Sequence, residues 1–317
     1  MNKVGGHRNF GYGKKMAWAG KQALRDRYGN GHYGTAGSHA ERWRQFVVWC
    51  RDERDIRDAK SVDRTTIVEY GQDLAEKVAA GQLSVSYAHN LLSTVNVVME
   101  SMRGDREVHV APASILGQRS RTRTDSPAGL DRKAVRQCAD RLRQNGHERI
   151  GALVEVARTL GLRLREASML DARAALGQAK KYGAVNITAG TKGGRGHRVD
   201  RRVPVSRSDI ACLQRAAGSQ GKGRNLIPPD LNWKQWNTRV HHVWASVRDD
   251  YGLTTIHDLR AAYACERYEQ LTGSVAPVIA GKRTAHRAID RQARQTIAQE
   301  LGHSRIDVVS SYIGGVR

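Results

Sequence analysis

The chain has 317 residues and a formal net charge of +22, from 53 Lys and Arg against 31 Asp and Glu. A length beyond about 250 residues favours two domains over one. The apolar fraction of 39% and the charged fraction of 26% are those of a folded protein, so the composition excludes wholesale disorder. The charge predicts attraction to a polyanion, and nucleic acid is the commonest large one.

Membrane insertion and export are not indicated. No apolar run reaches the roughly 18 residues that a membrane helix needs, and the N-terminal stretch lacks the apolar core of a signal peptide. The cysteines lie far apart without the spacing of metal ligands, so we expect reduced thiols and no metal site. We therefore expect a cytoplasmic, nucleoid-associated protein.

Residues 1–30 are strongly basic. They hold seven basic residues and one acidic residue, a net of +6, interleaved with glycines and aromatic residues. This composition indicates either a basic arm that binds a phosphate backbone, with Lys14 and Lys15 among its contacts, or a solvated tail.

Residues 31–112 predict a small helical domain. Apolar residues recur at helical spacing in three runs, which begin near residues 37, 65 and 84. The pair Ser38 and Glu41 has the spacing of a capping box, which favours a helix start there.

Residues 113–130 break the helical pattern. The segment is rich in Ser, Gly and Pro and carries Arg119, Arg121 and Arg123. It predicts a flexible linker, whose arginines either cross a DNA duplex or keep an exposed linker soluble.

Residues 131–317 return to helical patterning, with one interruption. Runs of strand character at 184–188 and 198–205 flank the glycine-rich turn 190–196, which is a hairpin signal. The whole chain therefore predicts a mostly α fold with a small β-sheet in its C-terminal domain, an α+β arrangement.

Four short motifs in this domain carry reactive side chains. Taken alone, each has a commoner explanation: a surface salt bridge, a lysine or arginine at an exposed turn, a structural histidine, or a core aromatic residue. They are Gly-Leu-Arg at Arg163 with Glu166, the turn with Lys192, His257-x-x-Arg260, and Leu-Gly-His at His303 followed nine residues later by Tyr312. The turn with Lys192 also carries Arg195, which we expect to contact DNA.

In their order, these motifs resemble those of the tyrosine recombinase (phage integrase) family. The resemblance covers most of the chain: residues 31–112 resemble the family's core-binding DNA domain, residues 131–317 its catalytic domain, and residues 1–30 the arm-binding extension of some integrases. It implies a catalytic set of Arg163, Lys192, His257, Arg260, His303 and Tyr312.

The resemblance implies DNA cleavage through a 3′-phosphotyrosyl intermediate, with no metal and no cofactor. Fixed cations must then stabilise the charge on the phosphate, a task that suits arginine. Arg163 and Arg260 would clamp the phosphate and His303 would donate a further hydrogen bond. Glu166 would support Arg163 from behind.

The remaining roles concern protons. Tyr312 would attack the phosphorus, and because a phenol has a pKa near 10 it needs a base, for which His257 is the candidate. Lys192 would protonate the leaving 5′-hydroxyl.

The implied partner is double-stranded DNA, bound by a homotetramer on two DNA sites, with accessory DNA-bending or directionality proteins as candidate partners. Integration or excision of a mobile element is the expected role. The alternatives are relaxation of DNA by a type IB topoisomerase and a DNA-binding protein without catalysis.

Two features depart from the family pattern. The gap from Arg260 to His303 is 43 residues and contains the extra segment Gly273–Arg291, and only five residues follow Tyr312. We expect the extra segment to contact a neighbouring subunit or the DNA beside the cleavage site.

Overall fold

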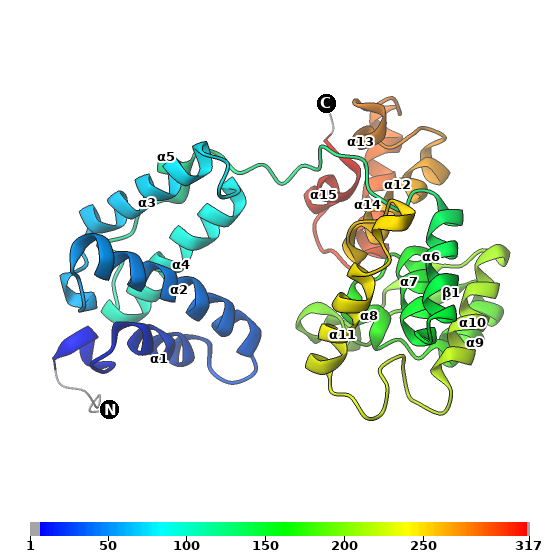
Figure 1. Cartoon of the computed structure of the whole chain (residues 1–317). Coiled ribbons are helices and arrows are strands. Elements are labelled where there is room, and N and C mark those ends of the chain that lie inside the picture. Colours follow the sequence, from blue (N-terminus) through cyan, green and yellow to red (C-terminus); the bar gives the residue numbers. More distant parts are fainter. Residues whose placement is uncertain (1–6, 316–317) are drawn as a thin grey trace. The chain divides into compact units, whose positions relative to one another are not determined.

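A computed structural model describes residues 7–315, apart from the side chains of residues 195 and 197. The DNA contact predicted for Arg195 therefore lies outside the described part. The chain divides into two compact units, Met1–Ser120 and Arg121–Arg317 (Figure 1). The predicted fold class is confirmed, since both units are mainly helical and the described sheet has two strands.

Unit 1 is entirely helical in its described part. Its elements are the 3₁₀ helix η1 (Arg8–Gly11), α1 (Met16–Tyr28), α2 (Tyr33–Arg54), η2 (Ala59–Ser61), α3 (Arg64–Ala79), α4 (Val85–Arg103) and α5 (Pro112–Leu116).

The three predicted helical runs correspond to α2, α3 and α4. The start of α4 follows from the sequence, because the Ser84 hydroxyl caps it by accepting from the backbone N–H of Tyr87 at 3.2 Å. Helix α2 begins earlier than the Ser38 capping pair predicts. Its aromatic residues form the core of the unit with Tyr70 of α3, whose ring centroid lies 4.9 Å from that of Phe46.

Of the predicted basic arm, residues 7–28 are folded onto unit 1, and residues 1–6 lie outside the described part. The buried residues of α1 recur at helical spacing, and Trp43 of α2 donates its indole N–H to the Met16 carbonyl at 3.0 Å. Asn9 is also buried and binds the backbone of Ala59. Residues 7–28 therefore contribute to the unit 1 core. The sequence does not reveal this, because the buried stripe of α1 consists largely of small residues.

Gly20 is the point of closest approach between α1 and α2. A Cβ added at Gly20 would lie 2.2 Å from Nε1 of Trp43, a contact that two packed helices cannot accept without moving apart. We expect Gly20→Ala to destabilise unit 1 by about 1–3 kcal/mol, measured by urea unfolding followed through tryptophan fluorescence.

Gly37 of α2 supplies the matched control. A Cβ there would meet nothing within 4 Å, so Gly37→Ala should raise stability by a few tenths to about 1 kcal/mol through helix propensity. Equal effects of the two substitutions would contradict the close packing of α1 on α2.

Unit 2 contains ten α-helices and a hairpin in its described part. They are α6 (Arg132–Gln144), α7 (Glu148–Leu160), α8 (Leu164–Ser168), α9 (Ala172–Tyr182), β1 (Ala184–Asn186), β2 (Arg202–Pro204), α10 (Ile210–Gln220), α11 (Trp233–Ala245), α12 (Ile256–Thr272), α13 (Pro277–Ala280), α14 (Arg287–Glu300) and α15 (Ser310–Ile313). Short 3₁₀ helices lie between them at Lys192–His197, Arg207–Asp209, Asp249–Tyr251 and Asp307–Val309.

Helix α7 is the central element of unit 2. All its residues from Ile150 to Leu160 are buried, and α6, α10 and α12 pack around it (Figure 1). Helix α7 ends at Leu160 and is capped by Gly161, the first residue of the predicted Gly-Leu-Arg motif, so a deeply buried helix positions the first catalytic candidate.

The predicted hairpin is confirmed, with shorter strands and a longer connection. Strands β1 and β2 pair antiparallel with Val185 opposite Val203. Gly190, in the connection, has φ +72°, and a Cβ there would lie 2.6 Å from the Arg165 carbonyl. Only glycine allows the loop that carries Lys192 to approach α8 this closely.

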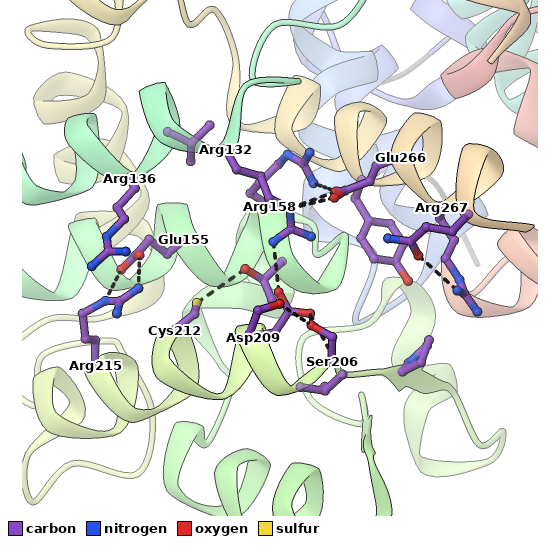
Figure 2. A pocket seen from close by; sticks show the side chains of 17 residues that line it. Arg132, Arg136, Glu155, Arg158, Ser206, Asp209, Cys212, Arg215, Glu266 and Arg267 are labelled. Atoms are coloured by element: carbon purple, nitrogen blue, oxygen red, sulfur yellow. Dashed lines mark hydrogen bonds and ion pairs between the residues drawn. The ribbon is translucent and has the colours of Figure 1, made fainter. Parts of the chain in front are cut away.

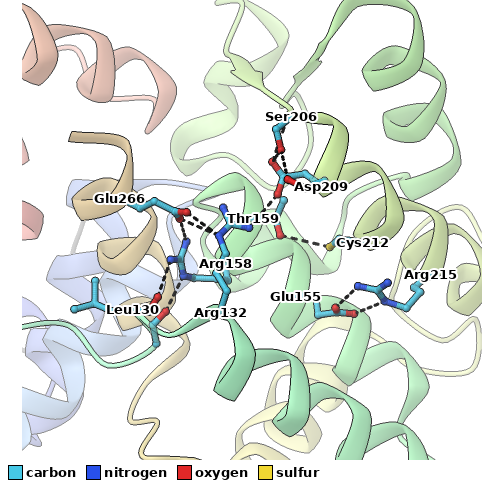
Figure 3. A network of polar contacts seen from close by, with 12 residues as sticks. Leu130, Arg132, Glu155, Arg158, Thr159, Ser206, Asp209, Cys212, Arg215 and Glu266 are labelled. Atoms are coloured by element: carbon cyan, nitrogen blue, oxygen red, sulfur yellow. Dashed lines mark hydrogen bonds and ion pairs between the residues drawn. The ribbon is translucent and has the colours of Figure 1, made fainter. Parts of the chain in front are cut away.

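A charged network surrounds a cavity of about 600 Å³ lined by α6, α7, α10 and α12 (Figure 2). Arg132 bridges Asp209 at 2.9 Å and Glu266 at 2.8 Å, and the buried Arg158 pairs with Glu266 at 2.7 Å (Figure 3). None of the six predicted catalytic residues lines this cavity.

In the described part of the chain, no helix combines the length and apolarity that spanning a bilayer requires.

Candidate active site

Arg163 and Glu166 form the first half of the site. Arg163 precedes α8 as its N-cap, and its Nη1 donates to Glu166 Oε1 at 2.7 Å. The backbone N–H of Arg163 donates to Glu166 Oε2 at 2.8 Å. The motif thus forms a closed turn, in which the buried carboxylate holds a guanidinium that is 26% exposed and open to a ligand.

Arg260 lies beneath this turn. It is fully buried in α12, and its guanidinium donates to the carbonyls of Gly161 and Leu301. Burial lowers the pKa of Arg260 to about 10, so the group remains cationic at neutral pH. These carbonyl contacts fix the plane of the guanidinium and leave Nε directed at the hydroxyl of Tyr312 at 3.4 Å.

His303 and Tyr312 complete the cluster from the C-terminal end. Nε2 of His303 lies 3.1 Å from the Tyr312 hydroxyl and 3.3 Å from a guanidinium nitrogen of both Arg163 and Arg260. Tyr312 is 4% exposed and sits in α15. Four predicted catalytic residues from four separate parts of unit 2 therefore meet at one nitrogen.

The protonation state of His303 follows from its neighbours. A guanidinium is a donor only, so the two arginine contacts require Nε2 to be an acceptor and the ring to be neutral. Burial and the neighbouring guanidiniums, that of Arg260 foremost, lower the pKa of His303 to about 4, which agrees. A neutral Nε2 at 3.1 Å can accept a hydrogen bond from the phenol, but the lowered pKa makes it a weak base.

Arg201 is a member of the cluster that the sequence reasoning missed. It is buried before β2, its Nη1 lies 2.9 Å from Glu166 Oε1, and its Nε donates to the Glu300 carbonyl at 2.7 Å. Glu166 therefore faces three guanidiniums, which leaves a net charge of +2. An excess of fixed positive charge in a partly buried site favours the binding of an anion such as a phosphate.

The lowered pKa of Glu166 in the folded protein contributes to the free energy of unfolding. Burial alone would raise that pKa, but the three arginines outweigh it and lower the pKa of Glu166 from 4.5 to about 2. A lowered pKa gives stability that is present above pH 4.5 and lost as the pH falls through about 2. We expect Glu166→Gln to cost about 3 kcal/mol at pH 7 and less at pH 3, measured by urea unfolding at both pH values.

Glu269 offers the control for this substitution. It is exposed on the same α12 that carries Arg260, so Glu269→Gln should change stability by no more than about 0.5 kcal/mol at either pH. A loss in Glu166→Gln that did not shrink at pH 3 would show that the carboxylate charge is not its cause.

His257 lies beside the cluster, whereas Lys192 stands on the loop between the strands of the hairpin. The His257 ring is exposed at the start of α12, with its centroid 5.5 Å from that of Tyr312. The start of α12 is the predicted one, because the Thr255 hydroxyl accepts from the N–H of Asp258 at 3.2 Å. Lys192 is exposed on the hairpin loop, and among the described residues no hydrogen bond or ion pair joins it to the other five.

The predicted DNA contacts fall into two groups. Lys14, Lys15, Arg119 and Arg121 are exposed, as a phosphate contact requires. Arg123 instead pairs with Asp258 at 3.0 Å and is only 17% exposed.

The extra segment Gly273–Arg291 packs partly on its own chain. Val278 of α13 is 9% exposed, and a Cβ at Gly314 would lie 2.7 Å from its backbone nitrogen. Arg294 of α14 donates to the carbonyls of Gly314 at 3.1 Å and Gly315 at 2.9 Å. These contacts support the end of α15 from within the subunit, whereas Val275 and Ile279 remain 39% exposed.

Part of unit 2 is similar to a known protein family. Residues 121–266, all in unit 2, match the family model described as Integrase. This match agrees with the resemblance of the motifs to the tyrosine recombinase (phage integrase) family.

Solved structures support the same fold for both units. A crystal structure of a lambda integrase dimer bound to a COC′ core site matches with a TM-score of 0.56 and 14% identity over 93% of this chain and 75% of that chain. A second structure, of lambda integrase(75-356) on the same site, matches with a TM-score of 0.55 and 14% identity over 93% of this chain and 95% of that chain. No curated protein matches the chain in sequence.

Proposed function

We propose that this protein is a site-specific DNA recombinase that cleaves and rejoins DNA through a 3′-phosphotyrosyl bond at Tyr312. The observation that carries the proposal is the meeting of Arg163, Arg260 and the Tyr312 hydroxyl within hydrogen-bond distance of Nε2 of His303. Two guanidiniums beside a tyrosine hydroxyl bring a nucleophile and an anion site together.

The proposed reaction needs no energy source other than the bond it breaks. Attack by the phenol oxygen forms the phosphotyrosine and releases the 5′-oxygen, which takes a proton from Lys192. Attack by a 5′-hydroxyl reverses these steps and frees Tyr312. The phosphodiester energy is kept in the protein–DNA bond throughout.

The proton of Tyr312 has two candidate acceptors. The 3.1 Å contact with Nε2 favours His303 in the arrangement described, whereas the family resemblance favours His257. When Arg163 and Arg260 turn to a bound phosphate, they no longer donate to Nε2 of His303. His303 and His257 can then exchange the roles of proton acceptor and hydrogen-bond donor during the reaction.

The proposed partner is double-stranded DNA, held by a homotetramer on two sites during integration or excision of a mobile element. The net charge of +22 supports a DNA partner, and the lambda integrase structures of the same fold contain DNA. Accessory DNA-bending or directionality proteins are part of the same proposal.

A nicked suicide substrate carrying the end sequence of the source element tests the proposal. The expected result is a covalent protein–DNA band that survives denaturation and requires that sequence. A band without sequence dependence would indicate a topoisomerase, and no band with intact binding would indicate a DNA-binding protein without catalysis.

A further inference from the structure

The segment that enters unit 2 lies against two parts of the candidate site at once. The backbone N–H of Arg123 donates to the Ser310 carbonyl at 3.0 Å, two residues before Tyr312. Its side chain pairs with Asp258 at 3.0 Å, beside His257. A single residue therefore joins the helix of the nucleophile to the start of α12, which also carries Arg260.

The ion pair is held in place on both sides. The Arg123 and Asp258 side chains are only 17% and 16% exposed. Asp258 also accepts from the hydroxyl of Thr254, and Arg123 Nε donates to the Asp125 carbonyl at 2.7 Å. A pair with little exposure and further hydrogen bonds is screened less by salt than a pair on the surface.

The end of the same segment is also fixed. The buried Arg158 donates to the carbonyls of Gly129 at 2.7 Å and Leu130 at 3.3 Å (Figure 3). A Cβ at Gly129 would lie 2.7 Å from a methyl carbon of Leu259 in α12, so the chain runs directly against that helix. With both ends fastened, Arg123 has a defined position relative to α12.

The pair also changes the charge that an incoming phosphate meets. Without Arg123, Asp258 would place an uncompensated carboxylate next to His257, at the edge of a site with an excess of guanidinium charge. A carboxylate there would repel the phosphate. Loss of the Arg123 side chain therefore removes the contact with α12 and the charge compensation together.

We propose that Arg123 is a positioning residue for DNA cleavage: it holds the segment of Tyr312 against the start of α12 and neutralises Asp258. The inference rests on the proposed function of Tyr312 as nucleophile. It differs from the phosphate contact that the linker composition predicts for Arg123. A positioning role predicts slower cleavage with unchanged DNA affinity, whereas a phosphate contact predicts weaker binding with normal cleavage at saturation.

The test measures adduct formation in a single turnover at saturating DNA, with DNA affinity measured separately in the Tyr312→Phe background. We expect Arg123→Ala to form adducts roughly 10- to 100-fold more slowly and to bind DNA within about twofold of the parent with the same salt slope. Both variants keep the backbone N–H, but Arg123→Lys also keeps a cation that can reach Asp258, so it should recover most of the rate.

Arg143 supplies the matched control. Its side chain is 18% exposed and pairs with Asp140 at 2.8 Å and with Glu155, between α6 and α7. Arg143→Ala thus loses a comparable ion pair that touches no catalytic candidate, and it should form adducts at the parent rate.

Asp258→Asn tests the pair from the other side. It should slow adduct formation as well, and the double variant with Arg123→Ala should be no slower than the slower single variant, because both remove one interaction. Normal cleavage by Arg123→Ala, or a lower DNA affinity with a smaller salt slope and normal cleavage at saturation, would overturn the inference. No adduct with the unmodified protein would instead refute the proposed function.

Discussion

Replacing Tyr312 by Phe is expected to abolish covalent adducts with DNA while leaving DNA binding nearly unchanged. The substitution removes one oxygen from a side chain that is 4% exposed and keeps the ring that packs under the guanidinium of Arg260, with a centroid distance of 5.4 Å. The fold should therefore persist. Without the nucleophile the rate should fall by roughly 10⁴-fold or more, below detection on a suicide substrate.

Tyr268 is the control for the loss of a buried hydroxyl. It is fully buried in α12 and donates to Asp290 at 2.8 Å, so Tyr268→Phe also removes a hydroxyl that bonds inside the protein. This variant should still form adducts. Adducts that persist in Tyr312→Phe would show that another residue is the nucleophile, and their mapping to a peptide would identify it.

The parts of the fold that were predictable are those with local signals. Ser84 and Thr255 cap helices where the sequence places them, and the turn 190–196 connects a real hairpin. Helix α1 was missed because its buried stripe consists largely of small residues. Such residues can pack only when another helix comes close, and Gly20 against Trp43 is a contact that no local pattern contains.

The candidate site shows the same division between local and distant information. The order of the motifs sufficed to select the four residues that meet at Nε2 of His303. Arg201 carries no comparable signal, because a buried arginine beside a strand looks like any polar residue of a hairpin until Glu166 is seen 2.9 Å away. Arg123 looked like a linker arginine for the same reason, since its partner Asp258 lies 135 residues further along the chain.

Lys192→Ala is expected to slow cleavage of ordinary DNA by roughly 10²- to 10⁴-fold. Gly190 holds its loop against α8, whereas Lys192 itself is exposed and Gly193 and Gly194 both have positive φ. A lysine two residues beyond an anchored glycine can reach into the site from outside the scaffold. Its ammonium would protonate the 5′-oxygen, which otherwise departs as a strongly basic alkoxide.

Sulfur at the 5′ leaving position separates this role from a role in binding. A thiolate leaves without a proton, so Lys192→Ala should cleave the sulfur substrate at close to the parent rate, a recovery that a lost phosphate contact would not show. Lys222 stands between Gly221 and Gly223 on another exposed turn of unit 2, so Lys222→Ala should cleave both substrates normally. If Lys192→Ala cleaves the sulfur substrate as slowly as ordinary DNA, the proton comes from another group. The exposed His257 would then be the next residue to test, because it is the remaining proton donor at the open edge of the cluster.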